Sequence, residues 1–254
     1  MLTRKRQPVQ PTGALKLRSD LGFDSFILPG VGADLVTGAP VIKGTAESIV
    51  AGRSGSALYG TATDGTATAW TIPDASKMLS TTDATVLIAG ALVARYGGGS
   101  GSFGCANQST APGAVCGAYL PYSDGKVYWD FGGGTEGATR LSVASLSFAE
   151  TDVFVFTTGP RGMEIWQNGK RVASNSASPT RTSSSNPFGL QSHYQSGLGD
   201  GVKCYAFGYS RKQLSLDKCA NLSRDLWGTA FVQRRRGLIA SLAAAARRRV
   251  VMWG

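Results

Sequence analysis

Histidine and cysteine are scarce in this sequence. Its 254 residues include one histidine, His193, and four cysteines, Cys105, Cys116, Cys204 and Cys219. No two cysteines have the Cys-x-x-Cys spacing of a structural zinc site, so we expect no metal and no other cofactor. Cys105 and Cys116 flank a Pro-Gly turn and could face each other across a hairpin, but a reducing cytoplasm favours thiols. We therefore interpret the cysteines as small buried hydrophobic residues.

Acidic residues are also few, at 16 against 26 basic residues, and they are not arranged for catalysis. Glycoside hydrolysis requires two carboxylates that flank the scissile bond. No Glu-x-Asp-x-x-Glu pattern occurs, and Glu164, on a predicted strand, has no acidic neighbour two residues away. His193 lies in a polar segment without a nucleophile-elbow motif, which is typical of an exposed loop. The sequence thus predicts a protein that is not an enzyme.

Long hydrophobic runs are absent. The most extended apolar segments fall far short of the ~20 residues that span a bilayer. The N-terminus reads Met-Leu-Thr-Arg-Lys-Arg-Gln-Pro, and no apolar segment typical of a signal peptide follows it. We expect a protein that is made in a cytoplasm and does not enter a membrane.

The net charge of +10 is concentrated at the two ends of the chain. Residues 1–20 carry a net charge of +4 and residues 230–254 carry +6, which leaves none on residues 21–229. Such ends are typical of arms that dock on an acidic partner or on nucleic acid, although they can also be solvated tails that keep a neutral body soluble. The candidate docking residues are Arg4, Lys5, Arg6, Arg234, Arg235, Arg236, Arg247, Arg248 and Arg249.

The basic segments give little sign of sequence-specific nucleic-acid recognition. Only Trp253 lies among the basic residues as an aromatic, so any contact with nucleic acid would be through charge alone. We favour docking of both arms on a neighbouring protein shell.

The neutral middle reads as many short strands joined by turns. Glycine is frequent, at 34 residues, and Asp124-Gly125 and Asn168-Gly169 are strong hairpin signals because both residue pairs tolerate positive φ. Residues 84–96 form the most apolar stretch and are predicted to be a central strand buried on both faces. Further strands are expected at 127–131, 151–157, 163–166 and 201–209.

Two helices are expected after the last strand. Ser215 is a natural N-cap for a short helix that carries Leu222 and Leu226 on one face and ends at Gly228. A second helix is predicted over 233–251, with an arginine triplet at each end. Its apolar stripe is thin, so we expect it to need a partner surface.

Five aromatic residues are candidates for a sugar-stacking surface: Tyr122, Tyr128, Trp129, Trp166 and Tyr194. The alternative is that alternate members pack in the core of a sandwich. Tyr128 and Trp129 are adjacent, so on a strand their side chains point to opposite faces, and one of them should be exposed or at an interface.

Residues 163–172, Met-Glu-Ile-Trp-Gln-Asn-Gly-Lys-Arg-Val, resemble the strand, Asn-Gly-Lys, strand hairpin of laminin-G-like, concanavalin-A-like jelly rolls. Residues 202–227 are similar to the closing strand and helix of that family. Residues 26–38 and 55–58, with Phe-Ile-Leu-Pro-Gly and Asp-Leu-Val-Thr-Gly, are similar to the start of such domains in tailed bacteriophages. Thr151-Asp152 replaces the Trp-His pair common in the family, and no pair of acidic loop residues for calcium can be matched.

The resemblance implies an all-β jelly-roll sandwich over 21–229, between a basic arm at 1–20 and a basic helix or arm at 230–254. It also implies a structural protein of the bacteriophage virion: a capsid-decorating, head-fibre or tail-associated subunit that docks on other virion proteins. The alternative is a carbohydrate-binding adhesin that recognises host surface glycans. By analogy with other shell proteins we expect a homo-oligomer, with a trimer as the first guess.

Overall fold

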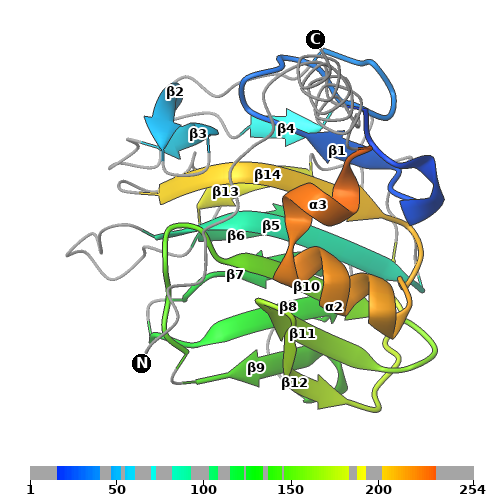
Figure 1. Cartoon of the computed structure of the whole chain (residues 1–254). Helices are drawn as coiled ribbons and strands as arrows, with labels where there is room; N and C mark the ends of the chain where they lie inside the picture. The colour runs from blue at the N-terminus through cyan, green and yellow to red at the C-terminus, as the bar shows by residue number, and fades with distance from the viewer. Residues whose placement is uncertain are drawn as a thin grey trace, which may run out of the picture.

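A computed structural model describes residues 16–40, 47–52, 55–60, 70–72, 82–92, 103–107, 115–122, 124–133, 137–144, 146–182, 188–192 and 202–232. Within these residues the fold is a sandwich of two antiparallel sheets with two short helices packed on one side (Figure 1). The predicted all-β fold class is therefore confirmed.

The larger sheet has eight strands in the order β12-β11-β10-β5-β14-β3-β2, with β1 also paired to β14. Their bounds are β1 Ser25–Ile27, β2 Glu47–Gly52, β3 Gly55–Gly60, β5 Ala84–Leu92, β10 Val153–Thr158, β11 Met163–Gln167, β12 Lys170–Asn175 and β14 Val202–Ser210. The strand β5 lies at the centre and is buried from Ala84 to Gly90, as its continuous apolar sequence predicts.

The smaller sheet has six strands in the order β4-β13-β6-β7-β8-β9. Their bounds are β4 Trp70–Ile72, β6 Phe103–Asn107, β7 Val115–Tyr119, β8 Val127–Gly132, β9 Arg140–Val143 and β13 Phe188–Ser192. A short 3-10 helix, η2 Gly137–Thr139, precedes β9. The two sheets enclose one hydrophobic core, in which Trp129, Phe131, Phe154 and Phe156 are fully buried.

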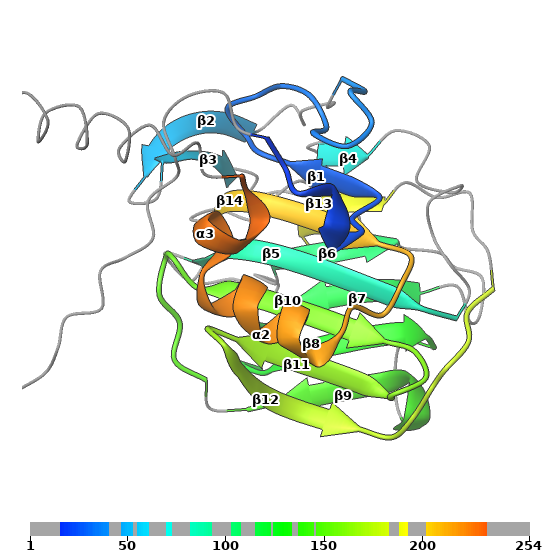
Figure 2. The same ribbon diagram turned by 45° about the vertical axis from the view of Figure 1, so that its right-hand side comes forward.

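A second hydrophobic core covers the opposite face of the eight-stranded sheet. The helices α2 Leu216–Arg224 and α3 Leu226–Ala230 pack there together with η1 Ser19–Leu21, so the domain has three layers (Figures 1 and 2). Leu222, Leu226 and Trp227 contribute the buried helix side chains of this layer. Because the helices cover the eight-stranded sheet, the outer face of the six-stranded sheet is the face without a helical layer.

The helical region differs in one respect from the sequence prediction. Ser215 caps α2, and its side chain accepts a hydrogen bond from Lys218 N, as expected. Gly228, however, does not end the helix. The break falls at Asp225, whose carboxylate accepts from Gly228 N and starts α3, so one predicted helix is two.

The folded body extends beyond the 21–229 range that the sequence indicated. Arg18 N donates to Ala230 O at 2.9 Å, and Val232 N donates to Lys16 O at 2.9 Å, with Leu17 paired to Phe231. The two ends of the described chain therefore lie side by side on the helical layer. The predicted 233–251 helix lies outside the described residues.

The two hairpin turns read from the sequence are both present. Asn168 and Gly169 have φ angles of 50° and 86°, and Gly125 has a φ of 83°. Successive positive φ angles at Asn168-Gly169 match the twist of a tight hairpin, which is why an Asn-Gly pair occupies this position. The Asp-Leu-Val-Thr-Gly segment also forms a turn, because the buried Asp34 carboxylate accepts from Ser25 Oγ and from the Val36 backbone N–H.

Candidate functional site

Three tyrosines gather on the outer face of the six-stranded sheet. Along β7 and β8, alternate side chains such as Ala118 and Trp129 enter the core, so their neighbours Tyr119 and Tyr128 point outward. The β7–β8 pairing places Tyr119 directly opposite Tyr128. Tyr122 joins them from the turn between the two strands.

The tyrosine cluster, as we call Tyr119, Tyr122 and Tyr128, is held by edge-to-face contacts. The ring centroid of Tyr122 lies 5.7 Å from that of Tyr119 and 5.7 Å from that of Tyr128, with interplanar angles of 83° and 88°. This geometry is the favourable one for aromatic pairs. All three side chains remain half-exposed. Tyr119 lies along the sheet, since a Cβ at Gly117 would come within 3.2 Å of its hydroxyl.

An ion pair supports the Tyr128 ring from β9. The guanidinium carbon of Arg140 is 4.5 Å from the centroid of that ring. The same guanidinium donates two hydrogen bonds, of 2.7 and 2.6 Å, to the carboxylate of Asp130. Asp130 is fully buried, and burial raises the pKa of its carboxyl to about 6 despite the opposing effect of Arg140.

The hydroxyl end of Tyr128 is fixed by the turn residue Asp124. Tyr128 Oη donates to Asp124 Oδ2 at 2.5 Å, and Asp124 Oδ1 accepts from Lys126 N at 2.9 Å. The hydrogen bond to Asp124, together with burial, raises the pKa of Tyr128 to about 12. For Asp124, burial acts upward on the pKa, but the hydrogen bonds from Tyr128 and Lys126 outweigh it and the pKa is lowered. The site therefore presents a neutral phenol and an ionised carboxylate at neutral pH.

The five-residue aromatic surface expected from the sequence is wrong in two of its members. Trp129 is 0% exposed between the sheets, where its Nε1 donates to Thr157 O. Trp166 is buried on the other face of the eight-stranded sheet, and its Nε1 donates to Glu164. Both tryptophans are core residues because strand alternation turns them inward. Tyr194 lies outside the described residues.

Tyr119 was missed by the sequence reading. The Asp124-Gly125 turn sets the β7–β8 register, so counting back from Tyr128 across that turn would have found it. Of the expected residues, Tyr122 and Tyr128 are brought together. The nine basic residues predicted to dock on a partner lie outside the described part of the chain, so their role stays a prediction.

Glu164 is buried and enclosed by partners. Its carboxylate accepts from Thr157 Oγ1 and Trp166 Nε1 and forms ion pairs with Arg171 at 3.2 Å and Arg161 at 3.5 Å. It lies at 1% exposure beneath the helical layer. This arrangement gives Glu164 a structural role in the sheet.

The thiols that the structure describes are also internal. Cys116, Cys204 and Cys219 are buried and form no disulfide. Cys105 is paired with Ala118 and Cys116 with Asn107, so the two cysteines are not opposite one another in the β6–β7 hairpin. This confirms the interpretation of these three as buried hydrophobic residues.

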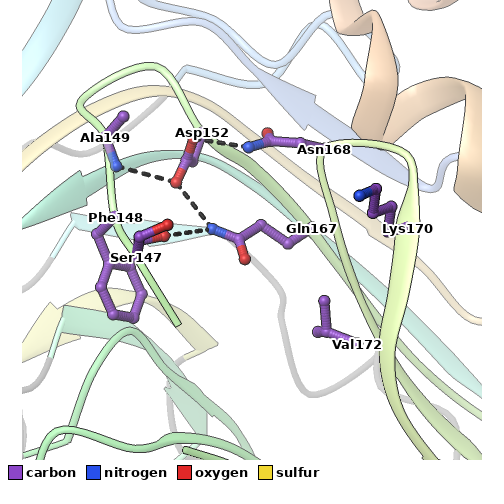
Figure 3. Close-up of a pocket in the computed structure, with 8 residues that line it drawn as sticks. All are labelled: Ser147, Phe148, Ala149, Asp152, Gln167, Asn168, Lys170 and Val172. Carbon is purple, nitrogen blue, oxygen red and sulfur yellow. Dashed lines mark hydrogen bonds between the residues drawn. The ribbon is translucent and has the colours of Figure 1, made fainter. Parts of the chain in front are cut away.

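A separate pocket of about 290 Å³ opens between the 147–152 loop and the β11–β12 hairpin (Figure 3). The lining residues of this pocket are held together by Asp152, which is 6% exposed. The Asp152 carboxylate accepts hydrogen bonds from Ala149 N at 2.9 Å, Gln167 Nε2 at 2.9 Å and Asn168 Nδ2 at 2.8 Å. Asp152 thus ties the loop to the Asn-Gly turn.

Among the side chains that the structure describes, no three His, Cys, Asp or Glu residues lie together as a metal ion would require. None of the described helices combines the length and apolarity needed to cross a bilayer.

No protein-family model and no curated protein sequence matches the chain. Solved structures do match. A Trypanosoma rangeli sialidase in complex with sialic acid is similar, with 13% identity, a TM-score of 0.53, and coverage of 85% of this chain and 35% of the sialidase. The binding domain of Paraclostridial Mosquitocidal Protein 1 gives 13% identity and a TM-score of 0.56, and covers 79% of this chain.

The binding domain of botulinum neurotoxin serotype G gives 11% identity and a TM-score of 0.57, again over 79% of this chain. This chain spans 51% of the mosquitocidal structure, 50% of the neurotoxin structure and about a third of the sialidase. At such low identity the likeness concerns the fold alone. The chain therefore has a lectin-like β-sandwich fold.

Proposed function

We propose that this chain is a non-enzymatic glycan-binding module and that the tyrosine cluster is its binding site. The observation that carries the proposal is the position of three half-exposed, mutually packed tyrosines on the sheet face opposite the helical layer. Rigid aromatic rings present apolar surface to the C–H face of a sugar at little entropic cost. The Asp124 carboxylate and the tyrosine hydroxyls can bond sugar hydroxyls around that surface.

The similar structures support this proposal at the level of the fold. One is a sialidase with sialic acid bound, and two are the binding domains of toxins. The buried and fully partnered Glu164 supports a role without catalysis, because it cannot reach a substrate.

A glycan array probed with the 254-residue chain tests the proposal. We expect binding to a defined set of glycans, and a loss of at least about fivefold in affinity for Tyr122→Ala, since one stacked ring contributes about 1 kcal/mol or more. Tyr59→Ala, which removes a half-buried tyrosine from the eight-stranded sheet, is the matched control and should bind normally. An array without hits, or equal binding by both variants, would refute the site.

A second role, as a virion subunit that displays this module, is favoured by the pairing of residues 16–18 with residues 230–232. Lys16 and Val232 are joined by a backbone hydrogen bond, so the basic segments 1–15 and 233–254 are attached at one place. That place lies on the helical layer, whereas the tyrosine cluster lies on the outer face of the six-stranded sheet, on the opposite side of the sandwich. Docking through the basic ends would leave the tyrosine face directed outward.

Truncation tests the docking role. The deletions should stop at residues 15 and 233, because residues 16–18 and 230–232 are part of the folded body. We expect each deletion to reduce incorporation of the protein into particles, counted by electron microscopy, while glycan binding persists. Normal incorporation of both truncated forms would exclude the docking role.

A further inference from the structure

The Asp152 pocket is a second concave polar site, separate from the tyrosine cluster. Its eight lining residues are Ser147, Phe148, Ala149, Asp152, Gln167, Asn168, Lys170 and Val172. None belongs to the tyrosine cluster or to its supporting residues. Its volume of about 290 Å³ lies at the lower end of the range for small-molecule sites, which suits one sugar ring better than an oligosaccharide.

The hydrogen bonds that build the pocket leave specific groups for a ligand. Gln167 uses its Nε2 for Asp152 and for Ser147 O, and no described residue donates to its Oε1. Figure 3 shows that oxygen turned away from these bonds, into the space between Ser147 and Val172. The Ser147 side chain and the exposed Lys170 ammonium supply donors at the rim. The pocket therefore offers both an acceptor and donors, as adjacent sugar hydroxyls require.

The charge and the apolar wall of the pocket narrow the ligand class. Asp152 and Lys170 are the only charged lining residues, so the lining carries no net charge. Phe148 and Val172 form an apolar wall, and Phe148 is held by stacking on Phe154, with ring centroids 6.0 Å apart. A neutral ring with hydroxyls on its edge and C–H groups on its face matches both features.

Strand register places this pocket at the same end of the sandwich as the Tyr122 turn. The 120–126 turn precedes Val127, which pairs with Val143 at the end of β9. The 147–152 loop follows β9 and leads into β10. At the start of β10, Phe154 pairs with Gln167 at the end of β11. The two sites therefore lie at the same end of the sandwich.

We propose that the Asp152 pocket binds a single neutral sugar ring, as a second saccharide subsite. This proposal rests on the proposed glycan-binding function, because it adds a second subsite to that function. The pocket can nevertheless be tested by itself. An anionic sugar is the competing ligand class, because Lys170 could pair with a carboxylate.

Backbone amide chemical shifts of the isotopically labelled 254-residue chain provide the test. Galactose, glucose and mannose are titrated singly, with glucuronate as the anionic comparison. We expect one of the neutral sugars to shift the amides of Phe148, Ala149 and Gln167 with a Kd of about 1–10 mM, the range for a few hydrogen bonds and one apolar contact. No shift at these amides, or tighter binding of glucuronate, would overturn the proposal.

Two pairs of variants locate the effect. Val172→Phe fills the pocket and should weaken binding at least about tenfold, whereas Val36→Phe, at an exposed valine of the 28–38 loop, should not. If Val172→Phe does not fold, Lys170→Ala against Lys212→Ala gives the same comparison with exposed lysines. If the pocket variant and its control bind the sugar equally well, the Asp152 pocket is not the binding site.

A variant in the tyrosine cluster tests the proposed function independently of the pocket. Tyr122→Ala should weaken array binding and leave the pocket shifts unchanged. Pocket shifts without array binding would support the subsite while refuting the tyrosine site, and array binding without pocket shifts would refute the subsite alone.

Discussion

The buried Asp130 should make the stability of this protein fall as the pH rises through the weakly acidic range. Its carboxyl has a pKa of about 6 in the folded protein, raised by burial from an ordinary value of 3.8. The folded state therefore holds this proton more tightly than the unfolded chain does. The stability that Asp130 contributes is complete below about pH 3.8 and is lost as the pH rises through about 6.

The magnitude follows from the two pKa values. A tenfold difference in proton affinity corresponds to about 1.4 kcal/mol, so the contribution of Asp130 is about 3 kcal/mol. Part of it is already lost at pH 4, and about 2 kcal/mol should disappear between about pH 4 and about pH 7.5. The side chain of Asp130 is 1% exposed, so solvent screening does not reduce this figure.

Asp130→Asn isolates the effect from the other carboxylates. Urea unfolding of both proteins across this pH range should show the free energy of unfolding of the parent falling by about 2 kcal/mol relative to the variant. Arg140 stays charged throughout this range, so Asp130 is the member of the pair that titrates, and its pKa already includes the attraction of Arg140. Parallel pH profiles, or a parent that gains relative stability with pH, would show that Arg140 keeps Asp130 ionised and would refute the reasoning.

Two further predictions concern buried groups. Asp152→Ala removes the acceptor of three hydrogen bonds whose donors water can partly reach, so the free energy of unfolding in urea should fall by about 1–2 kcal/mol, and an unchanged free energy of unfolding would contradict the network. Burial raises the pKa of the Cys116 and Cys219 thiols to about 12. We expect neither thiol to react with iodoacetamide near pH 8 in the folded protein, and both to react in urea; modification of either without unfolding would be inconsistent with this burial.

Local sequence determined much of the sandwich. Asn168-Gly169 and Asp124-Gly125 specify hairpins because these residues accept positive φ, and the apolar run from Ala84 specifies a strand buried on both faces. Ser215 determined where α2 begins. These features depend on the turn, capping and hydrophobic patterns of short continuous segments and so can be predicted without the fold.

Other features depended on tertiary packing. Which member of Tyr128 and Trp129 faces outward was open until the core on one side of the sheet was known. The sequence predicted one helix up to Gly228, but α2 ends at Arg224 because the Asp225 carboxylate caps a new helix, α3. The Asp152 network joins groups 15 and 16 residues apart, and no local pattern specifies such contacts.

The sequence by itself determined that this chain is a neutral sandwich with basic ends, because alternation, turn residues and charge are local properties. The tertiary structure alone decided that Tyr119, Tyr122 and Tyr128 meet and that the two ends of the described chain are paired on the opposite layer. The physical reason is that both depend on strand register and on which face of each sheet is buried, and these are set by long-range packing.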